Sequence, residues 1–199
     1  LAEQGMVFRA AYSNGPNCAP SRASLMSGQY TPRHGVFTVG DPWRAPEASR
    51  RLVPAENSTT LPLEKVTIPE ALDEAGYTSA FMGKWHLGEP GEAGPLEQGF
   101  DVNVGGTEIG HPPTYFSPYR IETLEDGREG EYLTSRLTEE ALSFLEEHHE
   151  DPFFLDLSHY AVHTPLQAPD SMVNRFEGDQ PWLHQDDPTY KAMVHAMDR

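Results

Sequence analysis

An alternation of helix and strand patterns in the second half of this sequence places the strongest constraint on its fold. Residues 67–70 (Thr-Ile-Pro-Glu) have the pattern of a capping box and open a helix that Gly76 ends, and residues 77–82 then have the composition of a strand. Residues 133–145 carry apolar side chains at helical spacing, and residues 152–158 form a nearly continuous apolar run. Because such runs are typical of strands covered on both faces, the sequence predicts an α/β fold with a largely parallel central sheet flanked by helices.

Shorter segments complete the expected organisation. We expect a helix end at Gly5 and then a strand at residues 6–8, a short strand within residues 100–106, a helix near residues 171–176 followed by a polar, proline-containing connection, and a helical pattern from residue 190 to the end. Residues 36–63 and 107–131 show little periodicity and contain several prolines, so both are expected to be loop excursions on the surface.

The only cysteine, Cys18, begins a further pattern. Pro20 and Arg22 follow it at fixed offsets, residues 21–27 favour a helix, and Gly28 suits the position just after one. Cys18 is therefore expected at or just before a helix N-terminus, where backbone N–H groups favour anions. A lone cysteine is most often a small buried hydrophobic residue, but a sulfur, a cation and a helix end so close together suggest chemistry on a sulfate or phosphate.

Polar side chains also follow both predicted strands of the alternating region. Lys84 and His86 stand two apart just after residues 77–82, so in an extended backbone they would point the same way. His163 follows residues 152–158. Open α/β sheets bind ligands at the carboxyl ends of their strands, although Lys84 and His86 alone would ordinarily be an exposed pair beside a packed tryptophan.

Three blocks of the sequence together resemble the type I sulfatases of the alkaline phosphatase-like superfamily. The blocks are Cys-Ala-Pro-Ser-Arg-Ala-Ser-Leu-Met-Ser-Gly from Cys18, Gly-Lys-Trp-His-Leu-Gly from Gly83, and Val-His-Thr-Pro from Val162. The resemblance implies an alkaline phosphatase-like sandwich. Because the sequence starts at Leu1 and ends in an uncapped helical pattern, we interpret residues 1–199 as the N-terminal part of the catalytic domain, truncated at both ends.

The resemblance implies an enzyme, a sulfuric ester hydrolase that cleaves aryl or carbohydrate sulfate monoesters. In that family the cysteine, here Cys18, is oxidised to formylglycine, whose hydrate supplies one hydroxyl as nucleophile and another that expels sulfate. Arg22 would then hold the hydrated group, Lys84 and His163 would bind sulfate oxygens, and His86 would transfer a proton to or from the ester oxygen. The roles of the two histidines could be exchanged.

Two other histidines match no motif of the family. His111 lies in the loop of residues 107–131, which in the family tends to meet substrate, so it is a further substrate-binding candidate. His159 follows the apolar run directly and is expected to be structural.

The resemblance also implies a divalent cation, calcium, that bridges the modified Cys18 and the sulfate. The carboxylate ligands of the family lie outside this sequence, and Asp41, Asp101 and Asp156 match none of them, so we expect the segment alone to lack activity. Expected partners are a sulfated small molecule or glycan as substrate and the formylglycine-generating enzyme during maturation. Family analogy suggests a periplasmic, secreted or lysosomal location, which the sequence itself leaves undetermined.

Charge and composition exclude some classes of function. The formal charge is -17, from 14 basic and 31 acidic residues, which argues against nucleic-acid binding through a broad basic face. No apolar run is long enough to span a membrane, and a single cysteine rules out an internal disulfide framework. So acidic a chain can still bind a sulfated substrate if its few cations gather at the site or a metal supplies positive charge.

Two alternatives stay open. One is a hydrolase of phosphate or phosphonate esters from the same superfamily, and the other is a non-catalytic homologue that binds sulfated glycan. The joint presence of the five residues proposed above argues against loss of catalysis: Cys18, Arg22, Lys84, His86 and His163. A cysteine phosphatase loop is disfavoured because Cys18 and Arg22 are too close in sequence for a full phosphate cradle.

Overall fold

The computed structural model describes residues 2–44, 46–178 and 186–199. Its α-helices are α1 (Cys18–Ser27), α2 (Thr31–His34), α3 (Ile68–Asp73), α4 (Leu133–His148), α5 (Asp170–Val173) and α6 (Pro188–Met197), and its strands are β1 (Thr78–Gly83), β2 (Val102–Val104) and β3 (Phe153–Ser158). Short 3-10 turns occur at η1 (Glu47–Ser49) and η2 (Leu96–Gln98).

The strand β1 is the middle of a parallel sheet in the order β2-β1-β3. Ala80 pairs with Val102 on one side and with Leu155 on the other. The side chains of β1 are almost all buried, as a central strand covered on both faces requires. The predicted parallel sheet is confirmed, and because Gly83 pairs with Ser158, the carboxyl ends of β1 and β3 meet at one edge.

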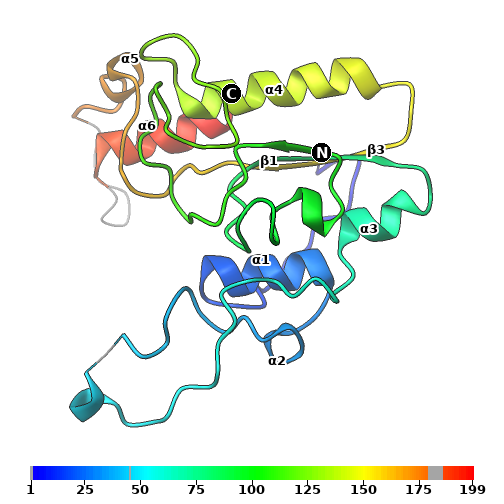
Figure 1. Cartoon of the computed structure of the whole chain (residues 1–199). Helices are drawn as coiled ribbons and strands as arrows, with labels where there is room; N and C mark the ends of the chain where they lie inside the picture. The colour runs from blue at the N-terminus through cyan, green and yellow to red at the C-terminus, as the bar shows by residue number, and fades with distance from the viewer. Residues whose placement is uncertain (1, 45, 179–185) are drawn as a thin grey trace.

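Helices cover both faces of this sheet (Figure 1). The amphipathic α4 lies along one face, where its buried Ala141 and Phe144 pack with Ala80 and Met82 of β1. On the other side of the sheet lie α1 and α3, and Met26 of α1 belongs to the buried cluster that fills the space beneath β1. Burial of two apolar layers against one sheet is the main source of stability in such an arrangement.

Local signals set the ends of the two helices below the sheet. The carboxylate of Glu70 accepts a hydrogen bond of 2.8 Å from the backbone N–H of Thr67, as a capping box requires, and α3 begins at the next residue. The helix α1 begins at Cys18 and is followed by Gly28, whose φ of 64° is the left-handed conformation that favours glycine. The expected position of Cys18 at a helix N-terminus is confirmed.

One expectation near the start of the chain is wrong, whereas the helix expected near residues 171–176 is present but shorter. Residues 6–8 form no strand in the part of the chain that the structure describes, since their side chains are exposed and no neighbouring strand pairs with them. The helix α5 ends at Val173, since beyond Asn174 the N–H groups of Arg175 and Phe176 bond to carbonyls only three residues back. The connection expected after it lies largely in residues 179–185, outside the described residues.

Two long segments carry little regular structure. Among the described residues of 36–63, only η1 is helical, and the side chain of Asn57 holds the base of this excursion by accepting from the backbone N–H groups of Phe37 and Thr38. Residues 107–131 contain no helix or strand, although Phe116 forms an isolated bridge with Tyr132. This second segment lies beside the carboxyl edge of the sheet because its first residue, Thr107, accepts from the backbone N–H of His86.

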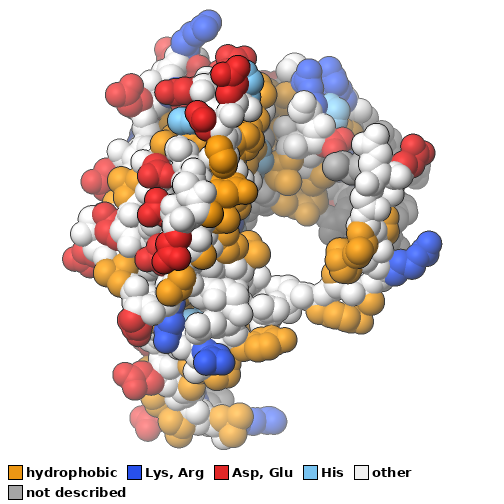
Figure 2. Space-filling model, turned by 90° about the vertical axis from the view of Figure 1, so that its right-hand side faces the viewer, with side chains coloured by type: hydrophobic (Ala, Val, Ile, Leu, Met, Phe, Trp, Pro, Cys, Tyr) orange, Lys and Arg blue, Asp and Glu red, His pale blue; other side chains and the backbone are white. Residues whose placement is uncertain are grey.

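The surface matches the acidic composition of the sequence. Figure 2 shows acidic side chains spread over a large part of one face, with basic side chains scattered between and beyond them. Within residues 2–44, 46–178 and 186–199, none of the helices combines the length and the apolar character needed to cross a membrane.

Candidate active site

Lys84 leaves the sheet at the edge where β1 and β3 end. Its backbone N–H donates to the carbonyl of Ser158 at 2.7 Å, which continues the strand pairing by one residue. The two backbones come this close because Gly83 has no side chain, since a methyl group there would overlap the carbonyl of Ser158. Lys84 is only 4% exposed, so a positive charge is held inside the protein at the carboxyl edge of the sheet.

Helix α1 brings Cys18 and Arg22 to the same place. The guanidinium of Arg22 donates a hydrogen bond to the backbone carbonyl of Lys84, which ties the helix to the end of β1. The thiol of Cys18 lies within hydrogen-bonding reach of the Lys84 side chain. Two segments far apart in the sequence therefore place a sulfur and two cations together, as their motifs predict.

Burial and mutual repulsion set the charges of these groups. Burial lowers the pKa of Lys84; Cys18 opposes this effect, and the neighbouring charge of Arg22 adds to it. Burial also lowers the pKa of Arg22, against the attraction of Asp156 on β3. Cations that are desolvated and close together gain free energy when an anion binds between them, because the anion offsets both costs.

A cavity of about 310 Å³ opens beside these residues. It is lined by Cys18, Ser21, Arg22, Leu25 and Ser158. Four of these lie on one side of α1, and Ser158 closes the cavity from the end of β3. The half-buried Cys18 therefore faces a space that could admit a small polar group.

His86 lies next to this group of cations but not by the geometry expected from the sequence. Its φ is 63°, so the chain turns instead of continuing as a strand past Lys84, and the expectation of an extended backbone is wrong. The imidazole nevertheless lies close enough to Lys84 and Arg22 for both cations to disfavour a charge on it. Burial first and these cations second lower the pKa of His86 to about 4, so this histidine is neutral at neutral pH.

His163 and His111 form a stacked pair beside His86. Their ring centroids are 5.8 Å apart and the rings are nearly parallel, at 18°. The backbone of His163 is fixed on both sides, since its N–H donates to the carbonyl of Tyr160 and its own carbonyl accepts from the hydroxyl of Tyr115 at 2.9 Å. Both rings are close enough to His86 to disfavour a charge on its imidazole, so the structure brings together all six site residues predicted from the sequence.

Sequence reasoning missed some residues of this site. Ser158 lines the cavity, Asp156 attracts Arg22, and Tyr160 donates from its buried hydroxyl to the carbonyl of Gly105 at 2.8 Å. Their position at the end of the apolar run was the available signal, because consecutive residues there meet the same sheet edge. His159 has a buried Nδ1 without a hydrogen-bond partner among the described residues, and burial lowers its pKa.

The described residues do not form a metal site of their own. Across residues 2–44, 46–178 and 186–199, no group of three or more histidine, cysteine or acidic side chains is arranged to hold a metal ion. Calcium prefers six to eight oxygen ligands, which this cluster of cations and imidazoles does not offer. The described residues present therefore do not fit calcium.

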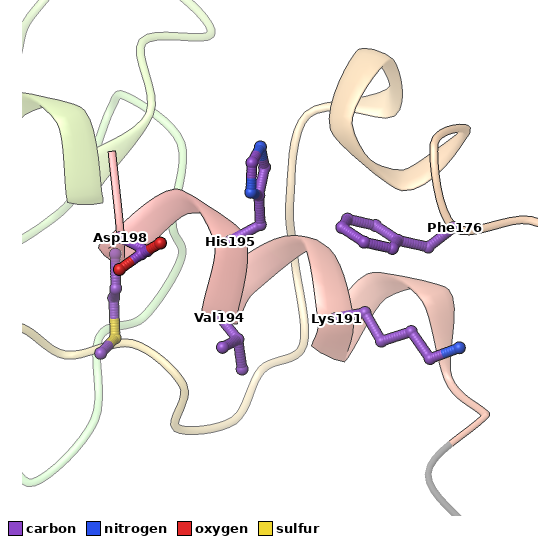
Figure 3. Close-up of a pocket in the computed structure, with 6 residues that line it drawn as sticks. Phe176, Lys191, Val194, His195 and Asp198 are labelled. Atoms are coloured by element: carbon purple, nitrogen blue, oxygen red, sulfur yellow. The ribbon is translucent and has the colours of Figure 1, made fainter. Parts of the chain in front are cut away.

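A larger cavity lies elsewhere in the protein. It measures about 440 Å³, is formed mainly by α6, and is lined by Phe176, Lys191, Val194, His195, Met197 and Asp198 (Figure 3). None of the predicted site residues contributes to it. The predicted site residues Cys18 and Arg22 line the smaller cavity instead.

Comparison with known proteins identifies the family of this chain. The family model described as Sulfatase matches residues 1–199. The chain is similar to N-acetylgalactosamine-6-sulfatase of Mus musculus, with 35% identity over 191 residues that cover 84% of this chain and 35% of the relative. It is also similar to an arylsulfatase of Hemicentrotus pulcherrimus, with 28% identity over 200 residues that cover 85% of this chain and 33% of the relative.

A solved structure supports the same assignment. The structure of Ps i-CgsB in complex with k-i-k-neocarrahexaose superposes with a TM-score of 0.70 and 29% identity, covering 94% of this chain and 43% of that one. This chain spans about one third of the length of the two curated relatives. From its complete match to the family model and the agreement in fold, the chain belongs to the sulfatase family.

Proposed function

We propose that the protein is a sulfuric ester hydrolase that cleaves sulfate monoesters, and that residues 1–199 belong to its catalytic domain. The observation that carries this proposal is the meeting of Cys18 and Arg22 at one cavity, with Lys84 beside both of them. A sulfate ester needs a nucleophile for sulfur, positive charge around its nonbridging oxygens and a proton for the leaving alcohol. The residues at and beside the cavity would supply each of these, and the family of the chain agrees with the chemistry.

Cys18 would act after oxidation to formylglycine. The position suits this group, because a half-buried side chain at the first residue of α1 faces open space and lies beside two cations. When present, the hydrated aldehyde supplies a hydroxyl for attack on sulfur and a second hydroxyl for release of sulfate, which an unmodified cysteine or serine cannot do. The formylglycine-generating enzyme would be a partner during maturation.

Lys84 and Arg22 would bind the sulfate group. Both are fixed before substrate arrives, Lys84 by its backbone hydrogen bond to Ser158 and Arg22 by its bond to Lys84. Fixed cations in a partly dry site stabilise the extra charge of the transition state without reorganising, which is the main requirement for electrostatic catalysis. Arg22 would also orient the group at position 18.

His86 would transfer the proton and His163 would bind a sulfate oxygen. In the reaction the bond between sulfur and the alcohol oxygen breaks, that oxygen takes a proton, and water supplies the oxygen that leaves with sulfate. His86 is neutral in the empty site, but a bound sulfate ester raises its pKa by offsetting the surrounding cations. Binding of the substrate would therefore allow His86 to carry the proton to the leaving oxygen.

The substrates that we propose are sulfated carbohydrates. The mouse relative is named for N-acetylgalactosamine, and the solved relative holds an oligosaccharide named neocarrahexaose. His111 would contact the part of the substrate beyond the sulfate, a role supported by its stacking on His163, the proposed sulfate ligand. A calcium ion would complete the site with ligands from outside these residues.

The test is a comparison of two esters of one alcohol. The protein is produced from its complete coding sequence together with a formylglycine-generating enzyme, and the release of alcohol from an aryl sulfate and from the matching aryl phosphate is measured. We expect sulfate turnover that Cys18→Ala and Lys84→Met abolish, whereas Lys65→Met, a substitution of the same kind outside the site, preserves it. Faster phosphate turnover would support the phosphate or phosphonate hydrolase instead, and binding of sulfated glycan with no turnover would support a non-catalytic homologue.

The role of His86 has its own test. Replacing His86 with alanine should slow esters of poor leaving groups more than activated aryl esters, because only the former need the proton. Equal losses for both classes of ester would reject this role and favour the exchange of His86 with His163.

A further inference from the structure

We propose that Gly110 is a positioning residue for His86, because its bare α-carbon forms the surface on which the imidazole rests. Neither the sequence motifs nor the family resemblance singles out this glycine. The consequence for catalysis rests on the proposed function of His86, whereas the packing relation between the two residues does not.

The contact itself is unusually close. A methyl group built on Gly110 would lie 2.6 Å from Nδ1 and 2.7 Å from Nε2 of His86, and closer still to Cε1. All three of the nearest atoms belong to the imidazole, so the ring occupies the volume that any side chain at position 110 would need. The φ of Gly110 is outside the left-handed region, and the backbone would therefore accept alanine if the ring were absent.

The imidazole depends on packing for its orientation. Its Nδ1 is buried and has no hydrogen-bond partner within the described residues, so at that atom no donor or acceptor fixes the ring. The cations Lys84 and Arg22 are also close enough to disfavour a charge on it. A ring without a hydrogen bond at one nitrogen is held by the shape of its surroundings, and Gly110 is the part of that shape in direct contact.

The loop that carries Gly110 is held in place by hydrogen bonds. The carbonyl of Thr107 accepts a hydrogen bond of 2.8 Å from the backbone N–H of His86. Gly106 exchanges two hydrogen bonds with the side chain of Asn103, at 2.9 and 3.0 Å. The buried hydroxyl of Tyr160 donates to the carbonyl of Gly105. A methyl group on Gly110 would therefore displace the imidazole rather than the loop.

The first experiment is a stability cycle that needs no enzymatic activity. Thermal unfolding is measured for the full-length protein and for Gly110→Ala, His86→Ala and the double variant. We expect Gly110→Ala to lower Tm in the parent protein and to have almost no effect when His86 is already alanine, because the clash has then lost its partner. An equal fall of Tm in both backgrounds would overturn the proposal.

A matched control lies in the same loop. Gly106 is also buried and outside the left-handed region, and a methyl group there would meet Asn103, Pro95 and Phe81, none of which belongs to the site. Gly106→Ala should therefore lower Tm by the same amount with or without His86. If the His86→Ala background rescued Gly106→Ala as well, the coupling would be a general property of the loop and the proposal would fail.

The second experiment measures catalysis. A displacement of a catalytic group by about 1 Å costs on the order of 100-fold in rate, so Gly110→Ala should lower kcat for a poor leaving group by roughly that factor and leave KM nearly unchanged. In the His86→Ala background it should lower kcat no further. A rise of KM at constant kcat, or the same loss in both backgrounds, would show that Gly110 acts elsewhere than through the imidazole.

Discussion

Replacing His86 with glutamine tests how strongly the site disfavours positive charge. The pKa of His86 falls from an ordinary value of 6.5 to about 4, first because of burial and then because of Lys84, Arg22, His163 and His111. In the unfolded chain the imidazole becomes protonated near pH 6.5, whereas in the folded protein it becomes protonated only near pH 4. The folded state therefore loses stability as the pH falls from 6.5 to 4, and glutamine removes that loss.

The size of the effect follows from the two pKa values. A pKa lower by roughly 2.5, at about 1.4 kcal/mol for each unit, sets a ceiling of about 3 kcal/mol. Because the imidazole is only partly buried, solvent screening reduces the expected effect to about 1–2 kcal/mol. Below pH 4 His86 is protonated in both the folded and the unfolded protein, so the difference in unfolding free energy between the parent protein and the variant should become constant.

The assay is urea unfolding of the parent protein and His86→Gln across pH 4 to 7, with the pKa of the imidazole read by NMR. The difference in unfolding free energy should grow in favour of the variant as the pH falls. Lys84→Met should raise the pKa of His86 without restoring 6.5, because burial is the larger cause, whereas Lys65→Met should leave it unchanged. Parallel stability curves, or an imidazole that titrates near 6.5 in the folded protein, would refute the reasoning.

Three further changes probe other parts of the account. Gly83→Ala should lower the free energy of unfolding in urea by roughly 3 kcal/mol or more, because Gly83 has a φ of 105° and its new methyl group would meet the carbonyl of Ser158. Gly130→Ala, at a positive φ but with open space around it, should cost only about 1–2 kcal/mol. Equal costs would contradict the close approach of β1 and β3. Arg22→Lys should lower kcat/KM by about 10- to 100-fold through loss of its bond to the Lys84 carbonyl, with exposed Arg33→Lys as a control without effect; unchanged kinetics would show that the bond is not needed. Leu137 of α4 is fully buried, so Leu137→Ala should lower the free energy of unfolding by about 2–5 kcal/mol but leave kcat of the folded protein unchanged. A fall in kcat would show that this part of the core also shapes the site.

The sequence predicted best those features that depend on local patterns. The capping box at Thr67 and the apolar stripe of α4 identify their elements because each is a property of a few neighbouring residues. The strand predicted at residues 6–8 is absent because local composition is not sufficient for a strand. A strand also needs a partner, and none of the described segments pairs with these residues.

The sequence motifs indicated several residues that the structure brings together, but not the geometry in which they meet. The motifs named Cys18, Lys84 and His86, yet the left-handed turn at His86 and the contact with Gly110 arise from how the loop after β2 folds back over the sheet edge. Such contacts join residues distant in sequence, and no local pattern encodes them. The same holds for Asp156, whose influence on Arg22 depends on the pairing of β3 with β1.

The central claim is that Cys18 becomes the nucleophile of a sulfate ester hydrolase. Its most direct test is peptide mass spectrometry of position 18 in a preparation of the full-length protein that releases sulfate. The account predicts that the thiol has been replaced by an aldehyde that reacts with a hydrazide probe, and that the modified fraction follows the specific activity across preparations. An active preparation in which Cys18 remains an unmodified thiol would contradict it.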